Sequence, residues 1–130
     1  MNFYEEKILP HIINCACSSA PMMELRSEVV PEASGKVLEV GMGSAVNLSL
    51  YDTEKVTKVW GLEPSDGMRQ RAQENLKRSS VPVEWIDLPG EQIPLEDNSV
   101  DTVLLTFTLC TIPDWLSALT QMKRVLKPDG

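Results

Sequence analysis

Two short apolar segments are each followed by residues that could bind a nucleoside. Gly41 directly follows the segment 36–40, with Gly43 two residues later, and Glu63 directly follows the segment 56–62. Glycines allow a backbone to turn tightly and to approach a ligand closely. An acid at the end of a second strand, twenty residues past Gly43, is placed to accept hydrogen bonds from both hydroxyls of a ribose. The spacing therefore predicts a ligand that contains a nucleoside, bound at the carboxyl ends of two parallel strands.

The acid inside the first segment, Glu39, separates two classes of such ligands. A dinucleotide site requires the pattern G-x-G-x-x-G, and the position of its third glycine is Val46 in this chain. Glu39 would also repel a pyrophosphate. S-adenosyl-L-methionine (SAM) carries no phosphate, and it offers an ammonium that Glu39 can hold. The residues favour SAM, and a nicotinamide-dependent oxidoreductase is the less favoured alternative.

The elements that must position these residues alternate along the chain. Hydrophobic periodicity and turn residues predict strands over 36–40, 56–62, 81–86 and 100–107. The same signals predict helices over 3–17, 21–30, 46–51, the stretch after Ser65, and 114–126. The last helix is expected to turn one apolar side inward, namely Leu116, Leu119, Met122 and Leu126. Strands that alternate with helices predict an α/β fold, a doubly wound parallel sheet of the Rossmann-like type.

Composition excludes several other classes of protein. The 130 residues suit one domain, and 12 Lys and Arg against 19 Asp and Glu give a net charge of −7. The only basic clusters are Arg69/Arg71, Lys77/Arg78 and Lys123/Arg124, which we expect to be solvated helix faces. A chain with this acidic balance is not expected to bind nucleic acid. Three cysteines without a repeated spacing do not form a disulfide framework, so we expect reduced cysteines in a cytoplasmic protein. No apolar run approaches the roughly 18 residues that a transmembrane segment needs.

Four motifs in order connect this chain to a known family. They are VLEVGMGSA at 37–45, VWGLEPSDGM at 59–68, PGEQIPLEDNSVDTVLLTFTLC at 89–110 and MKRVLKPDG at 122–130. With these motifs the chain resembles class I SAM-dependent methyltransferases. The stretches GSAVNLSLY and LCTIPD are most similar to small methyltransferases related to the membrane-associated thiol methyltransferases. The resemblance implies the strand order 3-2-1-4, SAM as cofactor and S-adenosylhomocysteine as product.

The resemblance also implies which residues contact the cofactor. The methionine part would lie against Glu39, Gly41, Met42, Gly43, Ser44 and Ala45. The adenosine part would lie against Glu63, Pro64, Met68, Gly90 and Glu91. Thr106 and Leu109 would border the sulfonium and the mouth of the substrate pocket. Within this set, Glu39 would hold the ammonium, directly or through water, and Glu63 would bind the ribose diol.

Two positions depart from the family pattern. Ala45 stands where the third glycine is usual, so a left-handed backbone there would cost about 1 kcal/mol. Pro89 stands where an Asp often contacts the adenine amine. These departures keep open a second function, a SAM-binding or interaction module without catalysis. The preferred function is methyl transfer to a small-molecule or lipid-like acceptor, and roles for Tyr4, His11 and Cys110 stay open.

The predicted organisation is a helical cap over 1–34 and a SAM-binding core over 35–130. The family's fifth to seventh strands follow the turn that ends this chain, so the chain is expected to be the N-terminal part of a longer domain. Alternatively, another chain covers the open edge of the fourth strand. Because exposed apolar edges promote pairing with other chains, we expect self-association through this edge or through the N-terminal helices.

Overall fold

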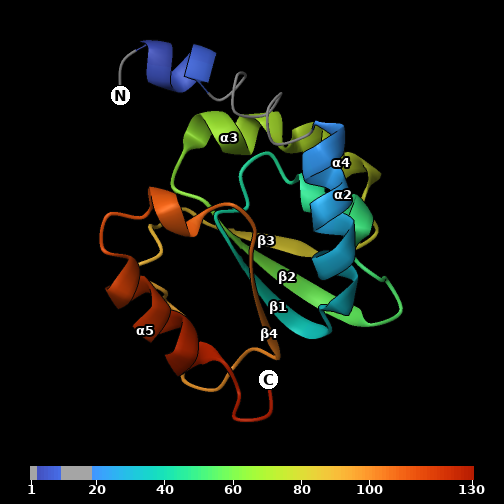
Figure 1. The fold of residues 1–130 in the computed structure, drawn as a ribbon, viewed down its shortest axis with the longest axis vertical. Coiled ribbons are helices and arrows are strands. Elements are labelled where there is room, and N and C mark those ends of the chain that lie inside the picture. Colours follow the sequence, from blue (N-terminus) through green and yellow to red (C-terminus); the bar gives the residue numbers. More distant parts are fainter. Residues whose placement is uncertain (1–2, 10–18) are drawn as a thin grey trace.

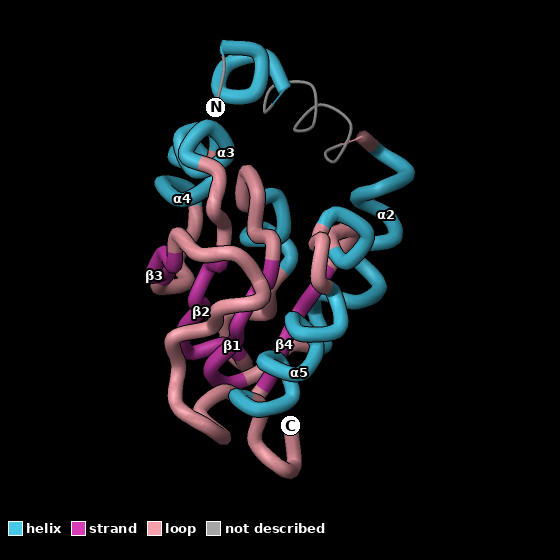
Figure 2. Tube along the Cα trace, turned by 90° about the vertical axis from the view of Figure 1, so that its left-hand side faces the viewer, coloured by secondary structure: helices cyan, strands magenta, loops and turns pink. Residues whose placement is uncertain are grey.

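A parallel four-stranded sheet forms the centre of the computed structural model, which describes residues 3–9 and 19–130. The strands are β1 (Gly35–Val40), β2 (Val56–Leu62), β3 (Val83–Ile86) and β4 (Thr102–Leu105). Their order is β3-β2-β1-β4, and every pair of neighbours is parallel, as Figure 2 shows from left to right. This confirms the predicted fold class and strand order.

Helices flank the sheet close to the predicted positions. The α-helices are α2 (Ala20–Val29), α3 (Asp66–Arg71), α4 (Gln73–Arg78) and α5 (Trp115–Val125). Shorter helical turns are η1 (Tyr4–Ile8), η2 (Val30–Glu32), η3 (Val46–Leu50) and η4 (Leu109–Thr111). Of the helix predicted over 3–17, residues 10–17 lie outside the described residues, and η1 is a single π-helical turn. No helix in the described ranges is both long and apolar enough to cross a bilayer.

The sheet separates two apolar layers, which the alternation of side chains along β1 defines. Val37 belongs to the layer that α2, η3 and α4 cover, while Leu38 and Val40 belong to the layer that α5 covers. Figure 1 shows α2 and α4 on one side of the sheet and α5 on the other. Glu39 lies between Leu38 and Val40 in β1, so alternation turns its side chain into the Val37 layer, beneath η3.

The inward face of α5 agrees with the prediction only in part. Met122 is buried and Leu126 packs against the same apolar layer, as predicted. Ala118 and Val125 are buried as well, whereas Leu116 is 62% exposed and Leu119 is also exposed. The small Ala118 packs close to Gly90, since a Cβ added at Gly90 would lie 3.5 Å from the Cβ of Ala118. This close approach of two small residues accompanies a rotation of the helix that leaves Leu116 and Leu119 exposed.

The fourth strand is shorter than predicted and lies at an edge. Val100 forms an isolated bridge to Leu126 before the strand begins, and Phe107 takes a left-handed backbone with φ of 56° after it ends. Among the described strands, β4 pairs only with β1. Its second edge is open, with α5 beside it in both views.

The rotation of α5 predicts a contrast between two truncations. Met122→Ala should lower the free energy of unfolding by about 2–5 kcal/mol, because it removes a side chain that is only 4% exposed. Leu116→Ala should change it by about 0.5 kcal/mol or less, because that side chain is on the surface. Urea denaturation of both variants measures this contrast. A loss of about 2 kcal/mol or more for Leu116→Ala as well would show that α5 is turned as periodicity predicts.

Candidate cofactor-binding site

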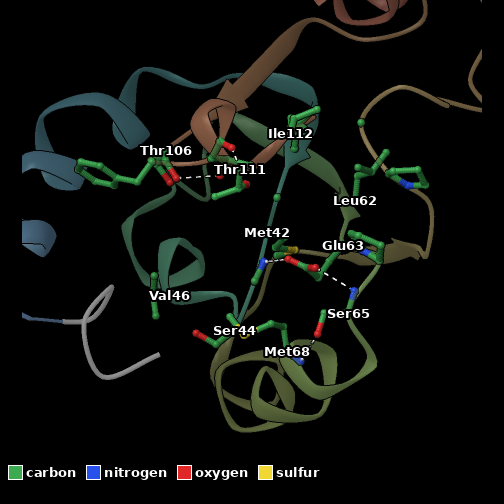
Figure 3. A pocket seen from close by; sticks show the side chains of 18 of the residues that line it. Met42, Ser44, Val46, Leu62, Glu63, Ser65, Met68, Thr106, Thr111 and Ile112 are labelled. Atoms are coloured by element: carbon green, nitrogen blue, oxygen red, sulfur yellow. Dashed lines mark hydrogen bonds between the residues drawn. The ribbon is translucent and has the colours of Figure 1, made fainter. Parts of the chain in front are cut away.

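A cavity of about 560 Å³ opens at the carboxyl ends of β1, β2 and β4. This volume suits a small molecule or cofactor. Figure 3 shows Glu63 and Ser65 on one side, Thr106 and Thr111 on the opposite side, and Met42 between them. Most of the predicted contact residues line it, namely Gly41, Met42, Gly43, Ser44, Glu63, Pro64, Met68, Gly90, Glu91 and Thr106. The fold therefore brings together residues that the motifs place far apart in the chain.

The loop after β1 needs glycine at two of these positions. Gly41 and Gly43 have φ angles of 71° and 60°, which residues other than glycine rarely adopt. A Cβ at Gly41 would lie 2.1 Å from Cγ2 of Thr108. Ala45 is left-handed as well, with φ of 64°, at a cost of about 1 kcal/mol. Ala45 is fully buried beneath the loop and does not line the cavity.

Glu63 is held firmly at the end of β2. The backbone N–H of Gly43 donates to its Oε1 at 3.0 Å, and the backbone N–H of Ser65 donates to its Oε2 at 2.9 Å. Burial raises the pKa of Glu63, although these two hydrogen bonds and the charge of Arg69 act in the opposite direction. Each carboxylate oxygen has a further lone pair, so the side chain can accept two more hydrogen bonds on the side that faces the cavity.

Glu39, to which the resemblance assigns the ammonium of SAM, lies in the buried layer beneath the glycine loop. It is 2% exposed and does not line the cavity, because its side chain enters the same layer as that of Val37. The Tyr51 hydroxyl donates to its Oε1 at 2.6 Å, and the Asn47 amide donates to its Oε2 at 3.1 Å. Burial raises the pKa of Glu39 to about 7, although both hydrogen bonds and the positive charge of Arg26 lower it. Both oxygens of Glu39 therefore already have partners within the fold.

A buried arginine is a residue that the sequence analysis missed. Arg26 of α2 lines the cavity and donates through Nη1 to Oδ1 of Asn47 and to Oγ1 of Thr106. The signal was present in the sequence. Arg26 shares a helix face with Met23 and Val30, three and four residues away, and a charged residue on an apolar helix face is unusual unless it is paired.

Other candidates from the sequence lie outside the cavity. Leu109 begins η4 without lining the cavity, and Cys110 beside it is exposed. Tyr4 is exposed, although Glu5 and Leu9 from the same N-terminal segment do line the cavity. His11 lies outside the described residues. A further unpredicted part of the lining comes from the segment after β4, at Phe107, Thr108, Thr111, Ile112 and Pro113.

The buried state of Glu39 predicts how stability depends on pH. Its pKa is about 7 in the folded chain against 4.5 as the ordinary value, so the folded chain binds more protons between these values. The resulting stabilisation is complete below the lower value and is lost as the pH rises through the higher one. Relative to Glu39→Gln, the parent chain should lose about 3 kcal/mol of unfolding free energy across this range.

Urea denaturation of the parent and of Glu39→Gln at several pH values measures this difference. The other titrating groups are common to both proteins, so their effects cancel. Parallel pH profiles for the two proteins would contradict the buried position of the carboxylate.

Comparisons with known proteins agree with the fold and with the cavity. A family model described as a methyltransferase domain matches residues 38–130. A demethylmenaquinone methyltransferase from Listeria welshimeri is 36% identical over 98 residues, which cover 72% of this chain and 41% of the relative. The enzyme of the same name from Staphylococcus aureus is 35% identical over 100 residues, which cover 73% of this chain and 40% of the relative. The chain thus spans about two fifths of the length of these relatives.

Solved structures of methyltransferases share the fold of this chain. A SAM-dependent methyltransferase from Aquifex aeolicus superposes with a TM-score of 0.68 at 27% identity, over 92% of this chain and 68% of that one. The match of the family model covers the glycine loop, Glu63 and the whole segment after β4 that borders the cavity. This chain belongs to the methyltransferase domain family, whose cofactor is S-adenosyl-L-methionine.

Proposed function

We propose that the protein binds SAM in this cavity and transfers its methyl group to a small apolar acceptor. The observation that carries the proposal is the joint placement of the glycine loop and Glu63 at one cavity. When bound, SAM supplies a methyl group on a positively charged sulfur, which a nucleophile can attack. The chain's own task is then to hold the reacting groups in line.

The residues present fit this cofactor. Left-handed Gly41 and Gly43 leave the loop without side chains where a ligand must approach closely. The Glu63 carboxylate, fixed by two backbone N–H groups, supports binding of the two ribose hydroxyls. Met68 and Pro64 provide apolar walls beside it for the adenine ring.

Apolar side chains elsewhere in the lining support an apolar acceptor. Outside the predicted cofactor contacts, the cavity is also lined by Leu9, Val46, Phe107, Ile112 and Pro113. Apolar side chains in a pocket favour a flat or lipid-like molecule over a charged metabolite. The relatives that are named demethylmenaquinone methyltransferases suggest a quinone-like acceptor, and we adopt this class for the proposal.

Calorimetric titration with S-adenosylhomocysteine tests the cofactor part. The parent should bind, and Glu63→Ala should weaken binding by about tenfold or more, because hydrogen bonds to a charged group are each worth roughly 1.5–3 kcal/mol. Glu54→Ala is the matched control, since Glu54 is exposed and lies outside the cavity. A folded parent that does not bind S-adenosylhomocysteine would overturn the proposal.

We also propose that the chain self-associates through the open edge of β4. The helix α5 lies beside this edge in Figures 1 and 2, and its exposed Trp115 and Leu116 would add apolar contact area. Sedimentation equilibrium should show an average mass that rises with concentration, and Trp115→Glu combined with Leu116→Glu should reduce the rise. The control is Thr53→Glu, on an exposed loop elsewhere. A parent that remains monomeric at all concentrations would contradict this proposal.

A further inference from the structure

The corner of the cavity between α2 and β4 is built from polar side chains that include an almost completely buried arginine. Arg26 is 5% exposed, and its Nη1 donates to Oδ1 of Asn47 at 2.9 Å and to Oγ1 of Thr106 at 2.6 Å. Arg26 and Thr106 both line the cavity. Buried polar groups of this kind are costly unless they are paired, so the direction of each hydrogen bond matters.

The chemistry of the guanidinium fixes the orientation of Asn47. A guanidinium has donors only, so the atom of Asn47 that faces Arg26 must be the carbonyl oxygen. The amide nitrogen of Asn47 consequently faces Oε2 of Glu39 at 3.1 Å and Oγ1 of Thr106 at 3.0 Å. The hydrogen bonds of this cluster therefore run in one direction, from Arg26 through Asn47 towards Glu39.

Because Arg26 and Asn47 both donate to the Thr106 hydroxyl, this hydroxyl can still donate its own hydrogen. A threonine hydroxyl has one hydrogen to donate and two lone pairs that accept. Arg26 and Asn47 both donate to Oγ1, so both lone pairs are used. The hydroxyl hydrogen of Thr106 has no acceptor among the described residues. It is available to a ligand in the cavity.

Arg26 has unused donors at the same corner. Its Nε is buried without a hydrogen-bond partner, and its Nη2 makes no hydrogen bond within the described part of the chain. The ring of Phe107 lies 5.2 Å from the guanidinium carbon, which is within the range of a cation–π contact. Phe107 reaches this place with a left-handed backbone, φ 56°, a strained conformation of the kind that clusters at functional sites.

We propose that Arg26 and Thr106 bind the carboxylate at the amino-acid end of SAM. This inference rests on the proposed function. Figure 3 shows Thr106 across the cavity from Glu63, so a nucleoside held at Glu63 directs its amino-acid end towards Thr106. That corner offers a positive charge and a hydroxyl donor, which suit a carboxylate. The Glu39 carboxylate is already hydrogen-bonded to Tyr51 and Asn47. The cofactor is therefore held at this end through its own carboxylate, and not through the contact between its ammonium and Glu39 that the motif implies.

The test compares S-adenosylhomocysteine with its decarboxylated analogue, which keeps the amine, the thioether and the adenosine. Calorimetry on the parent should give about tenfold or more weaker binding for the analogue, because a hydrogen bond between charged groups is lost. Thr106→Val should weaken binding of S-adenosylhomocysteine several-fold and leave binding of the analogue nearly unchanged. Thr106→Ser, which restores the hydroxyl, should recover the parent affinity.

Thr106→Val is expected to fold, because two hydrogen bonds of the cluster do not involve Thr106. Arg26 still donates to Asn47, and Asn47 still donates to Glu39. Thr102→Val is the matched control, since the Thr102 hydroxyl bonds to Ser34 outside the cavity. Equal affinity of the parent for both ligands would overturn the carboxylate site and leave the cofactor proposal standing. Equal weakening of both ligands by Thr106→Val would assign Thr106 a structural role and also overturn it. Binding of neither ligand to a folded parent would overturn both proposals.

Discussion

Burial of the Glu39 carboxylate beneath the glycine loop is the constraint on which the rest of this structure depends. An ionised carboxylate in an apolar layer is strongly destabilising unless it is hydrogen-bonded and its charge is balanced. Tyr51 and Asn47 supply the hydrogen bonds, and Arg26 supplies a positive charge one side chain further away. Because these partners come from different segments, one acid ties α2, η3 and β1 together. Arg26 is the one buried residue within α2, and its hydrogen bonds connect this helix to Asn47 and Thr106.

The same network connects the interior of the fold to the cavity. Asn47 lies between the buried acid and the two residues that line the cavity, Arg26 and Thr106. Its fixed orientation directs donors towards the ligand, so the polarity of this corner follows from the burial of Glu39. Burial and the Glu39 charge also raise the pKa of Tyr51, which keeps its phenol protonated as a donor. A change in the protonation of Glu39 would therefore alter the network that supports the ligand corner.

The sequence predicts the sheet well, because β1 and β2 are apolar and are bounded by turn residues. It predicts less about which way side chains point. The motif assigns Glu39 to the ligand, although alternation from Val37 places it in a buried layer. The rotation of α5 accompanies a close approach of Ala118 and Gly90, and helical periodicity alone does not contain that contact. Arg26 comes from a segment before the matched motifs, so only its place on an apolar helix face could have identified it.

In the proposed complex, the cavity holds the cofactor between Glu63 and the corner formed by Arg26 and Thr106. A crystal structure of the chain with S-adenosylhomocysteine bound would test this arrangement directly. We expect the ribose hydroxyls within hydrogen-bond distance of Glu63, the ligand carboxylate beside Arg26 and Thr106, and Glu39 still bonded to Tyr51 and Asn47. A ligand whose ammonium contacts Glu39, with Tyr51 displaced and Arg26 turned away, would contradict it.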